Sequence, residues 1–400
     1  MYYLGIDWAT EKHDLCLLDE SGTILRQLTI SQTDAGFERL QKLVEQYGAE
    51  NVQVNIERSD GLLVDWMLEQ GWALHVTPTL IVARRRPRRS KSDPSDAYLL
   101  AHLLRLKDPD CRRLTRSSSE VLYLRELARA LDRVVSDQRR LASRLNYLLH
   151  QYFPAATRLF AHVETLICLA FLEAYPTPEA ARRLTRYQLR QFLKSQKYTF
   201  LSRLDEIYQQ LQIPMPTASV PDGYVSQVRV LIPLLRELHH TRARLERELP
   251  LCFSQHPEAA WWRSFPGTKG PLTPARLLAW IGDDRQRFPT AEALQAIAGT
   301  APVTRRSGKS KYVEFRRACS RPLRKAIDDF ARQSLRYSSW AREYRAAQIA
   351  RGHGIARANR ALANRWLKII WTLWQRREFY DEAKHEANRQ KQMMPALKAS

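Results

Sequence analysis

Two carboxylates stand three residues apart in the stretch Lys91-Ser92-Asp93-Pro94-Ser95-Asp96-Ala97. Pro94 suits the first turn of a helix, and the three-residue spacing places Asp93 and Asp96 on the same helical face. A purely structural interpretation exists, because Asp93 is a good N-cap and Asp96 resembles the acidic partner of a capping box. Taken alone, the pattern favours that interpretation, since short acidic motifs often occur by chance.

Two upstream carboxylates follow apolar strands. Residues 2–30 read as three strands of an antiparallel meander, and the run Tyr3-Leu4-Gly5-Ile6 ends at Asp7. The alternating stretch 52–56 is a further strand, and it ends on Glu57. Helices at 34–47 and 61–70, a strand at 73–76 and a helix at 93–105 complete an α/β domain with a mixed sheet. We therefore expect Asp7 and Glu57 at strand ends, with Asp93 and Asp96 on the helix beside them.

Four carboxylates that converge from separate elements would repel one another without a bound cation. Ligation by oxygen alone selects hard divalent ions, and Mg²⁺ binds through few carboxylates while keeping water and phosphate oxygens. Such ions stabilise the oxygens of a phosphodiester during displacement. The acids therefore predict a Mg²⁺ site for nuclease-like or phosphoryl-transfer chemistry.

The net charge points to a polyanionic partner. The chain of 400 residues has 64 Lys and Arg against 42 Asp and Glu, a formal charge of +22, and a pI of about 10.0. Nucleic acid is the leading candidate. No apolar run approaches the roughly 18 residues of a spanning helix, and the first residues do not have the layout of a signal peptide. We therefore expect a cytoplasmic protein without membrane contact.

The cysteines and histidines do not indicate a metal or disulfide framework. The five cysteines are widely separated and form no CxxC pair, and His239-His240 has neither Cys nor carboxylate partners at ligand spacing. We interpret this His pair as exposed helix residues.

A basic run precedes the acidic motif. It contains six cations, Arg84, Arg85, Arg86, Arg88, Arg89 and Lys91. Charge runs are usually solvated linkers. Here phosphate contact is favoured, because Pro87 stiffens the run and the acidic motif follows at once.

Long helical patterns occupy the middle of the chain. Leucines and Val134 form an apolar stripe between 117 and 150, and Val230, Leu234, Leu238 and Leu245 form a second one between 226 and 249. An antiparallel pair, a dimer coiled coil and core packing within one chain are all compatible with these stripes. From Leu323 the chain is helical again, with Trp366, Trp371 and Trp374 mostly in its core, where stacking of some of them on nucleic-acid bases stays open. A polar, frayed tail follows from Gln375.

A basic loop near the C-terminal third contains a serine before a glycine. Ser307-Gly308 allows a positive φ and an exposed hydroxyl, and four cations surround it, Arg305, Arg306, Lys309 and Lys311. From the residues alone, such a loop is more often a phosphate-binding turn than a nucleophile.

Both motif sets resemble those of the DEDD transposases of insertion sequences, whose recombinases are guided by a bridge RNA. Gly5-Ile6-Asp7-Trp8-Ala9, Ile56-Glu57 and the 91–97 motif resemble the family's N-terminal domain, a Holliday-junction resolvase (RuvC-like) form of the ribonuclease H fold. This resemblance implies that Asp7, Glu57, Asp93 and Asp96 bind metal.

The C-terminal motifs match in the same order. They are Phe265-Pro266-Gly267, Gly282-Asp283, Phe288 and Ser307-Gly308. The resemblance implies that Ser307 is the nucleophile that becomes joined to DNA, with Ser310 and then Ser264 as weaker candidates. The chain departs from the family at Ala318-Cys319-Ser320-Arg321-Pro322, which has Pro322 and no glycine before the Leu-Arg helix.

The expected organisation follows from the resemblance. A RuvC-like DEDD domain covers 1–112, a helical coiled-coil region 113–256, a mainly α transposase domain with the serine 257–385, and a polar tail 386–400. The implied partners are double-stranded target and donor DNA, a structured non-coding guide RNA, and a homodimer that pairs into a tetramer. The implied function is site-specific DNA recombination with Mg²⁺.

Two alternative functions stay open. A Holliday-junction resolvase or nuclease would use the acids with water as the nucleophile, which leaves Ser307 as a phosphate contact. A non-catalytic nucleic-acid-packaging protein would use the charge alone.

Overall fold

The computed structural model describes residues 1–86, 93–214, 216, 218–268, 270–307 and 310–397, with the backbone alone at Asp93, Arg305, Arg306, Ser307, Lys311 and 390–397. The chain divides into two compact units. One contains residues 1–119, 282–335 and 339–380, and the other contains 120–281, 336–338 and the chain from 381.

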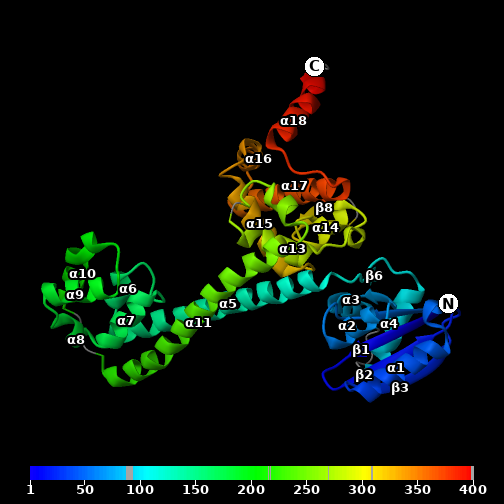
Figure 1. The fold of residues 1–400 in the computed structure, drawn as a ribbon, viewed down its shortest axis with the longest axis horizontal. Coiled ribbons are helices and arrows are strands. Elements are labelled where there is room, and N and C mark those ends of the chain that lie inside the picture. The colour runs from blue at the N-terminus through cyan, green and yellow to red at the C-terminus, as the bar shows by residue number, and fades with distance from the viewer. Residues whose placement is uncertain (87–92, 215, 217, 269, 308–309, 398–400) are drawn as a thin grey trace. The chain divides into compact units, whose positions relative to one another are not determined.

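A six-stranded mixed sheet organises the N-terminal part (Figure 1). Its strands are β1 (Tyr2–Trp8), β2 (Lys12–Leu18), β3 (Ile24–Ser31), β4 (Val52–Ile56), β5 (Ala73–Val76) and β6 (Arg112–Arg113), in the order β3-β2-β1-β4-β5-β6. The meander β1-β2-β3 is antiparallel, whereas β4 lies parallel to β1, and β5 parallel to β4. The mixed α/β sheet expected from the sequence is confirmed. The short β6, antiparallel to β5, was not expected.

One face of this sheet is covered by two amphipathic helices. They are α1 (Asp34–Gln46), which Thr33 caps through its side chain, and α2 (Leu62–Glu69). Leu4 and Ile6 of β1 pack into one buried cluster with Leu40 of α1 and Met67 of α2. The alternation of apolar residues along β1 therefore assigns this face to the larger core and leaves Tyr3 and Gly5 on the opposite face.

Helix α4 (Asp93–Arg105) covers the opposite face, and α3 (Thr79–Arg85) packs beside it. Tyr3 packs there in a small buried cluster with Ala97 and Ala101. The backbone of α4 comes so close to β1 that a Cβ atom on Gly5 would lie 1.9 Å from the carbonyl oxygen of Ala97 and 2.5 Å from the nitrogen of Ala101. Glycine is therefore required at position 5 to seat the helix that carries Asp96.

Replacing Gly5 by Ala is expected to destabilise the protein by about 3 kcal/mol or more, because both clashing atoms belong to the backbone of α4 and neither is able to rotate away. Urea unfolding measures this loss. Gly223→Ala is the matched control, since nothing lies within 4 Å of the added Cβ. Equal unfolding midpoints for the two variants would contradict the close approach.

The second unit is built on two long helices, α5 (Ser119–Tyr152) and α11 (Pro221–Gln255). They run antiparallel within the chain: Tyr123 Oη donates to Glu248 Oε1 at 2.6 Å, and the ring of Tyr152 stacks on that of Tyr224 at 5.9 Å. The shorter helices are α6 (Ala156–Leu159), α7 (Leu166–Ala174), α8 (Pro178–Arg182), α9 (Arg186–Ser195), α10 (Leu204–Gln212), α12 (Ala259–Arg263) and α13 (Leu272–Ile281). Of the alternatives left open by the sequence, this arrangement is the antiparallel pair.

The apolar face expected for α11 was only partly right: Leu245 is buried and Leu238 is partly buried, but the other two residues are exposed. Val230 is 62% exposed and Leu234 49% exposed, whereas Val228, Leu231 and Leu235 are buried. Both sets of residues have helical spacing, so periodicity alone does not choose between them. The buried set is selected because it packs into a cluster with α7, α9 and α10.

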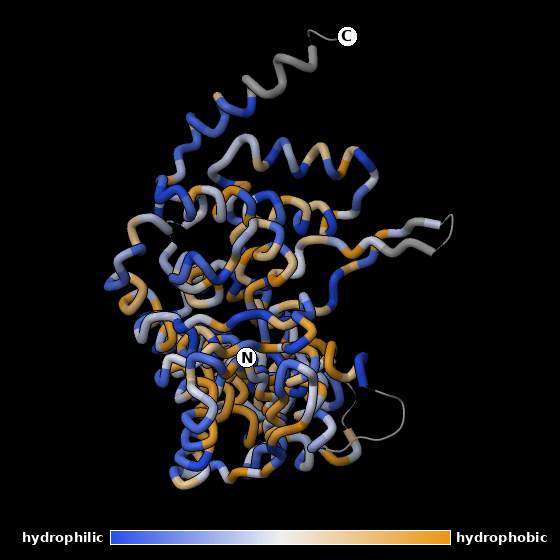
Figure 2. Tube along the Cα trace, turned by 90° about the vertical axis from the view of Figure 1, so that its right-hand side faces the viewer, coloured by the Kyte–Doolittle hydropathy of each residue, from blue (hydrophilic) through white to orange (hydrophobic). Residues whose placement is uncertain are grey.

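The C-terminal part of the first unit packs around α17 (Ile355–Arg376). Its other elements are α14 (Ala291–Ile297), β7 (Val303–Ser307), β8 (Ser310–Glu314), α15 (Arg321–Ser334) and α16 (Ser339–Ala350). Trp366 and Trp374 are fully buried, which confirms their assignment to the core, and Trp371 Nε1 donates to the carbonyl oxygen of Phe288. Figure 2 shows the β7–β8 hairpin extending away from the helices of this part.

Two sequence expectations for this region were wrong. The stretch 299–311, expected as a loop, contains β7, and Ser307 pairs with Ser310 across a two-residue connection. The chain from Gln375, expected as a frayed tail, forms α18 (Glu382–Leu397), where the Asp381 carboxylate accepts a hydrogen bond from the Lys384 nitrogen. The unusual Ser320-Arg321-Pro322 segment starts α15, with Ser320 as N-cap and the proline in the first turn.

No helix in the described ranges is long and apolar enough to cross a membrane.

Candidate functional site

Asp7 and Glu57 lie at the same end of adjacent parallel strands. Ile6 of β1 is in register with Ile56 of β4, Asp7 follows Ile6, and Glu57 is the first residue beyond β4. Sequence reasoning placed both acids at these strand ends, and the structure agrees.

The two acids share the sheet face that α4 covers. Gly5 meets the backbone of α4, and its register partner Asn55 donates from Nδ2 to the Leu100 carbonyl oxygen of α4 at 2.8 Å. Asp7 and Glu57 lie two residues beyond Gly5 and Asn55, and side chains two apart on a strand point to the same face. Both carboxylates therefore lie on the side of the sheet where α4 carries Asp96.

Asn55 fixes the height of α4 over the sheet. Its side chain is fully buried, and besides the bond to Leu100 its Nδ2 donates to Thr77 Oγ1 at 2.9 Å. An amide in this apolar position is costly unless bonded, and here it ties β4, β5 and α4 together. Asn55 was not identified from the sequence, although a lone amide in the strand Val52-Gln53-Val54-Asn55-Ile56 is a signal that could have indicated it.

Asp96 is paired with a cation at the C-cap of α3. Asp96 is 1% exposed, and its carboxylate forms a two-pronged ion pair with Arg86, in which Nε donates to Oδ1 at 2.5 Å and Nη2 donates to Oδ2. A guanidinium is the cation best suited to such a fork, because its planar donors match both carboxylate oxygens. Arg86 therefore lies inside the acidic site.

The surrounding acids affect the pKa of Arg86. Its pKa is raised, first by the hydrogen bonds to Asp96 and then by the negative charges of Asp96, Glu57 and Asp7. Three of the four predicted acids therefore act on one guanidinium. The fourth, Asp93, is the first residue of α4, three positions before Asp96, and its side chain lies outside the described part.

The carboxylate oxygens of these acids suit a hard divalent cation. In this structure the guanidinium of Arg86 balances the negative charge of Asp96 instead. Among the described residues, no three His, Cys, Asp or Glu side chains are grouped as metal ligands. Carboxylate oxygens at adjacent strand ends are nevertheless the ligands that Mg²⁺ prefers. The residues fit Mg²⁺ by chemistry and charge. The ion would take over the counter-charge that the Arg86 guanidinium supplies in this structure.

Trp8 and His13 support the turn after Asp7. The guanidinium carbon of Arg58 lies 4.2 Å from the centroid of the Trp8 ring. His13 is fully buried, its Nδ1 accepts from the Ala9 nitrogen at 3.4 Å, and burial lowers its pKa. A neutral His13 therefore holds the backbone that follows Asp7. Neither role was recognised from the sequence.

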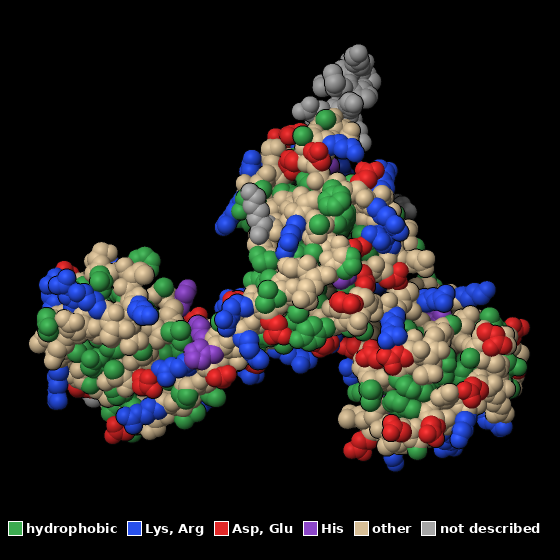
Figure 3. Space-filling view, in the orientation of Figure 1, with side chains coloured by type: hydrophobic (Ala, Val, Ile, Leu, Met, Phe, Trp, Pro, Cys, Tyr) green, Lys and Arg blue, Asp and Glu red, His purple; other side chains and the backbone are tan. Residues whose placement is uncertain are grey.

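The basic residues predicted to contact nucleic acid have different environments. Arg84 is exposed, and Arg85 is half exposed with an ion pair to Asp108 at 3.0 Å. Arg88, Arg89, Lys91 and Lys309 lie outside the described residues, as do the side chains of Arg305, Arg306 and Lys311. Figure 3 shows Lys and Arg interspersed with Asp and Glu over the visible face of each part. Their contacts to DNA or RNA stay predictions.

The three candidate nucleophilic serines differ in their positions along the backbone. Ser307 is the last residue of β7 and Ser310, which is exposed, is the first of β8, so both flank the hairpin connection. Ser264 instead donates its hydroxyl to the Trp261 carbonyl oxygen at 2.7 Å in the turn after α12. Ser264 therefore caps a local turn, and the hairpin keeps two serines at its tip.

Comparisons with known proteins cover both ends of the chain. Residues 4–154 match the family model of the IS110 DEDD transposases, described as "Transposase", and residues 262–346 match "Transposase IS116/IS110/IS902 family". The mini-circle putative transposase for IS117 of Streptomyces coelicolor is 34% identical over 399 residues, which cover 95% of each chain. The putative transposase y4uE of Sinorhizobium fredii is 30% identical over 201 residues, 48% of this chain and 56% of that protein.

A third relative, the insertion element IS110 uncharacterized 43.6 kDa protein of Streptomyces coelicolor, is 28% identical over 305 residues, 75% of this chain and 74% of that protein. Because the IS117 relative aligns along almost the whole chain and both family models match in order, the protein belongs to the IS116/IS110/IS902 family of transposases.

Proposed function

We propose that this transposase is an RNA-guided, site-specific DNA recombinase in which Asp7, Glu57, Asp93 and Asp96 hold Mg²⁺ and Ser307 is the nucleophile. The observation that carries the proposal is that Asp7 and Glu57 end adjacent parallel strands on the sheet face where α4 carries Asp96, and that the Asp96 carboxylate is paired with a cation, Arg86. The strand order, with a meander followed by two parallel strands, supports a ribonuclease H-like, RuvC-like assignment.

Bound Mg²⁺ would polarise the scissile phosphate and stabilise the leaving oxygen. Asp7 and Glu57 would hold the ion at the strand ends, and Gly5 and Asn55 keep α4, with Asp93 and Asp96, at a fixed height beside them. Arg86, released from Asp96 when the ion binds, would remain next to the site as a phosphate contact. The remaining cations, Arg84, Arg85, Arg88, Arg89, Lys91, Arg305, Arg306, Lys309 and Lys311, would contact the backbone of the nucleic acids.

The proposed covalent step exchanges one phosphorus–oxygen bond for another. Ser307 Oγ attacks the phosphorus, its proton leaves to solvent or a base, and the bond to the 3′ oxygen breaks while that oxygen takes up a proton. The products are a phosphoserine ester and a free 3′-hydroxyl. The reverse reaction with an exchanged strand restores the phosphodiester, so no nucleotide hydrolysis is needed.

Guidance by a structured RNA and assembly of dimers into a tetramer are the finer parts of the proposal. The net charge of +22 supports only that the protein binds some nucleic acid, and guidance by RNA comes from the family resemblance. A strand reaction on two duplexes requires several nucleophiles, which favours an assembly of several copies. The domain limits at 112, 256 and 385 belong to this proposal as well.

The test traps the covalent product. RNA that copurifies with the protein is sequenced and added back with donor and target DNA, and adducts are resolved on denaturing gels. We expect Ser307→Ala to abolish both the adduct and strand exchange, while Ser310→Ala, three residues along the same hairpin, retains both. The adduct should depend on the added RNA.

Cleavage without an adduct in Ser307→Ala would favour a nuclease that uses water. Loss of the adduct in Ser310→Ala, with Ser307→Ala active, would move the nucleophile to residue 310. Binding without metal-dependent chemistry in every variant would favour a packaging protein.

A further inference from the structure

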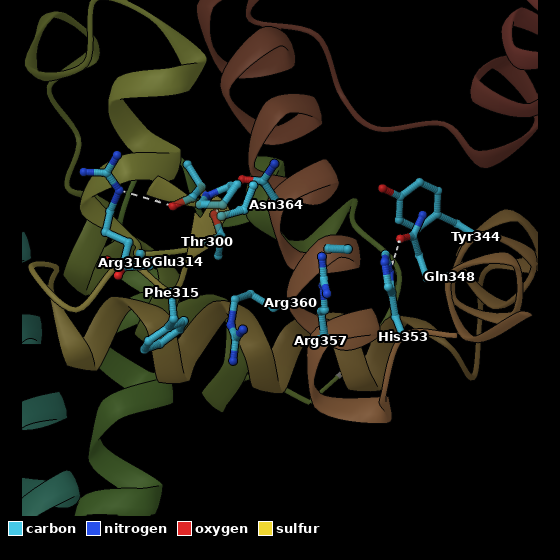
Figure 4. A pocket seen from close by; sticks show the side chains of 15 residues that line it. Thr300, Glu314, Phe315, Arg316, Tyr344, Gln348, His353, Arg357, Arg360 and Asn364 are labelled. Atoms are coloured by element: carbon cyan, nitrogen blue, oxygen red, sulfur yellow. Dashed lines mark hydrogen bonds between the residues drawn. The ribbon is translucent and has the colours of Figure 1, made fainter. Parts of the chain in front are cut away.

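A cavity of about 400 Å³ lies beside the base of the β7–β8 hairpin. It is lined by the turn 299–302 after α14, by the end of β8 and the residues that follow it, by Tyr344 and Gln348 of α16, by His353 between α16 and α17, and by α17 (Figure 4). Its volume falls within the roughly 300–1,000 Å³ of small-ligand sites. The acidic site uses none of its residues, so the cavity needs a separate explanation.

The lining is strongly cationic. It contains Arg316, Arg357, Arg360 and His353, with Glu314 as the one acid among its described residues. Arg357 is exposed and has no ion-pair partner within the described part of the chain. Arg360 differs, because its positive charge interacts with the half-buried carboxyl of Asp328. Burial raises the pKa of that carboxyl, and the Arg360 charge opposes the rise. Arg357 is therefore the cation available for an anionic group.

The helix α17 presents these groups on one face. Arg357, Arg360 and Asn364 are spaced by three and four residues, which aligns them along the cavity. Asn364 Oδ1 accepts a hydrogen bond from Thr300 Oγ1 at 2.8 Å. Its NH₂ group keeps two donors without partners among the described residues, and these suit the acceptor atoms on the edge of a nucleobase.

A flat apolar surface adjoins the charges. Phe315 is 41% exposed, and its ring centroid lies 4.2 Å from the guanidinium carbon of Arg360 and 4.4 Å from that of Arg324. Aromatic rings and stacked guanidinium planes are the surfaces on which unpaired bases stack. Cations and stacking surfaces together match a nucleotide better than a bare anion or an apolar ligand.

A buried amide holds the histidine of the cavity in place. Gln348 is 8% exposed, and its Oε1 pairs with Nδ1 of His353 at 2.9 Å (Figure 4). If Nδ1 donates to this amide oxygen, His353 Nε2 is left for a ligand.

The cavity and Ser307 lie at different positions along the same hairpin. Val313 lines it and pairs with Thr304, which is three residues before Ser307 on β7. Three strand residues span about 10 Å, a length that an unstacked strand of nucleic acid covers in a few nucleotides at most. A strand whose phosphate is at Ser307 would therefore reach the cavity with a nearby nucleotide.

We propose that this cavity binds one unstacked nucleotide of the DNA strand, with its phosphate at Arg357 and its base against the Phe315–Arg360 surface, a few nucleotides at most from the phosphate that Ser307 attacks. The binding of the nucleotide stands on the cavity itself; only its distance from the cleaved bond rests on the proposed role of Ser307.

The test uses the full-length Ser307→Ala protein, so that binding is measured without chemistry. A single-stranded decamer of thymidine with one 5-iodouracil is irradiated on the protein, and the crosslinked peptides are identified by mass spectrometry. We expect crosslinks in the peptides that contain Phe315 or Tyr344. Crosslinks confined to peptides that contribute no cavity residue would overturn the proposal.

Affinity measurements on variants distinguish base from phosphate. Arg357→Ala should weaken binding of the decamer about threefold to tenfold and reduce the slope of log affinity against log salt by about 0.7. Arg365→Ala, an exposed arginine of α17 outside the cavity, is the matched control and should leave both unchanged. Equal effects of the two variants would contradict the assignment of Arg357.

Phe315→Leu should weaken the thymidine decamer about fivefold or more, yet leave a decamer of abasic sugar phosphates unchanged. Equal weakening of both decamers would overturn base stacking. Because none of these measurements needs cleavage, a negative result here is separate from a failure of Ser307 as the nucleophile.

Discussion

Replacing Glu57 by Gln is expected to reduce DNA strand cleavage on the order of a thousandfold, with the fold retained. The substitution keeps the shape of the side chain and removes one negative charge from the ligands proposed for Mg²⁺. Loss of a metal that stabilises a developing oxyanion is worth several kcal/mol, and each 1.36 kcal/mol is a factor of ten in rate.

The matched control for Glu57→Gln is Glu38→Gln, an identical change at an exposed position of α1, which should retain activity within about twofold. The double variant Asp7→Asn with Glu57→Gln should be no slower than either single variant, because residues that act as one unit are not additive. Near-normal cleavage by Glu57→Gln in Mg²⁺ would exclude the acidic cluster from catalysis.

The second large effect concerns Arg86. Without divalent cations, Arg86→Gln is expected to lower the free energy of unfolding by about 3–5 kcal/mol, because it leaves the Asp96 carboxylate, 1% exposed, without its counter-charge. Added Mg²⁺ should recover much of this loss, since the ion supplies the missing charge. The measurement is urea unfolding with and without Mg²⁺.

The wild-type protein should be stabilised less by the same Mg²⁺ concentration, because there the ion competes with the guanidinium. Arg84→Gln, at an exposed position two residues earlier, should cost less than about 1 kcal/mol with or without the ion. An Arg86→Gln loss that does not respond to Mg²⁺ would show that the pair is structural and unrelated to metal binding.

The elements that position the acids were predictable because their signals are local. Apolar alternation in 2–30 and 52–56 gives the strands, and it also places Asp7 and Glu57 at their ends. The spacing of Asp93 and Asp96 after a basic stretch gives the start of α4. None of these features requires knowledge of the tertiary structure.

The partner of Asp96 was not predictable in the same way. Arg86 is one of six cations in a run, and only the packing of α3 beside α4 distinguishes it from Arg84 and Arg85. The buried face of α11 likewise depends on which neighbours pack against it, since Val230 and Leu231 each belong to a helical stripe. The hairpin at Ser307 was missed because its two strands of five residues carry several basic and polar residues, so they show little apolar alternation.

The cavity beside α17 was not predictable from the sequence. Its residues come from five segments between 299 and 364, and each has an ordinary local explanation: Arg357 and Arg360 as solvated helix cations, Asn364 as a polar helix residue. Only their convergence around one space of about 400 Å³ indicates a binding site.

The most direct test of the account is anomalous X-ray scattering from crystals of the protein grown with Mn²⁺ in place of Mg²⁺. We predict a peak about 2.0–2.2 Å from carboxylate oxygens of Asp7 and Glu57, with Arg86 withdrawn from Asp96. Mn²⁺ bound only elsewhere, with the ion pair between Arg86 and Asp96 intact at saturating metal, would contradict it.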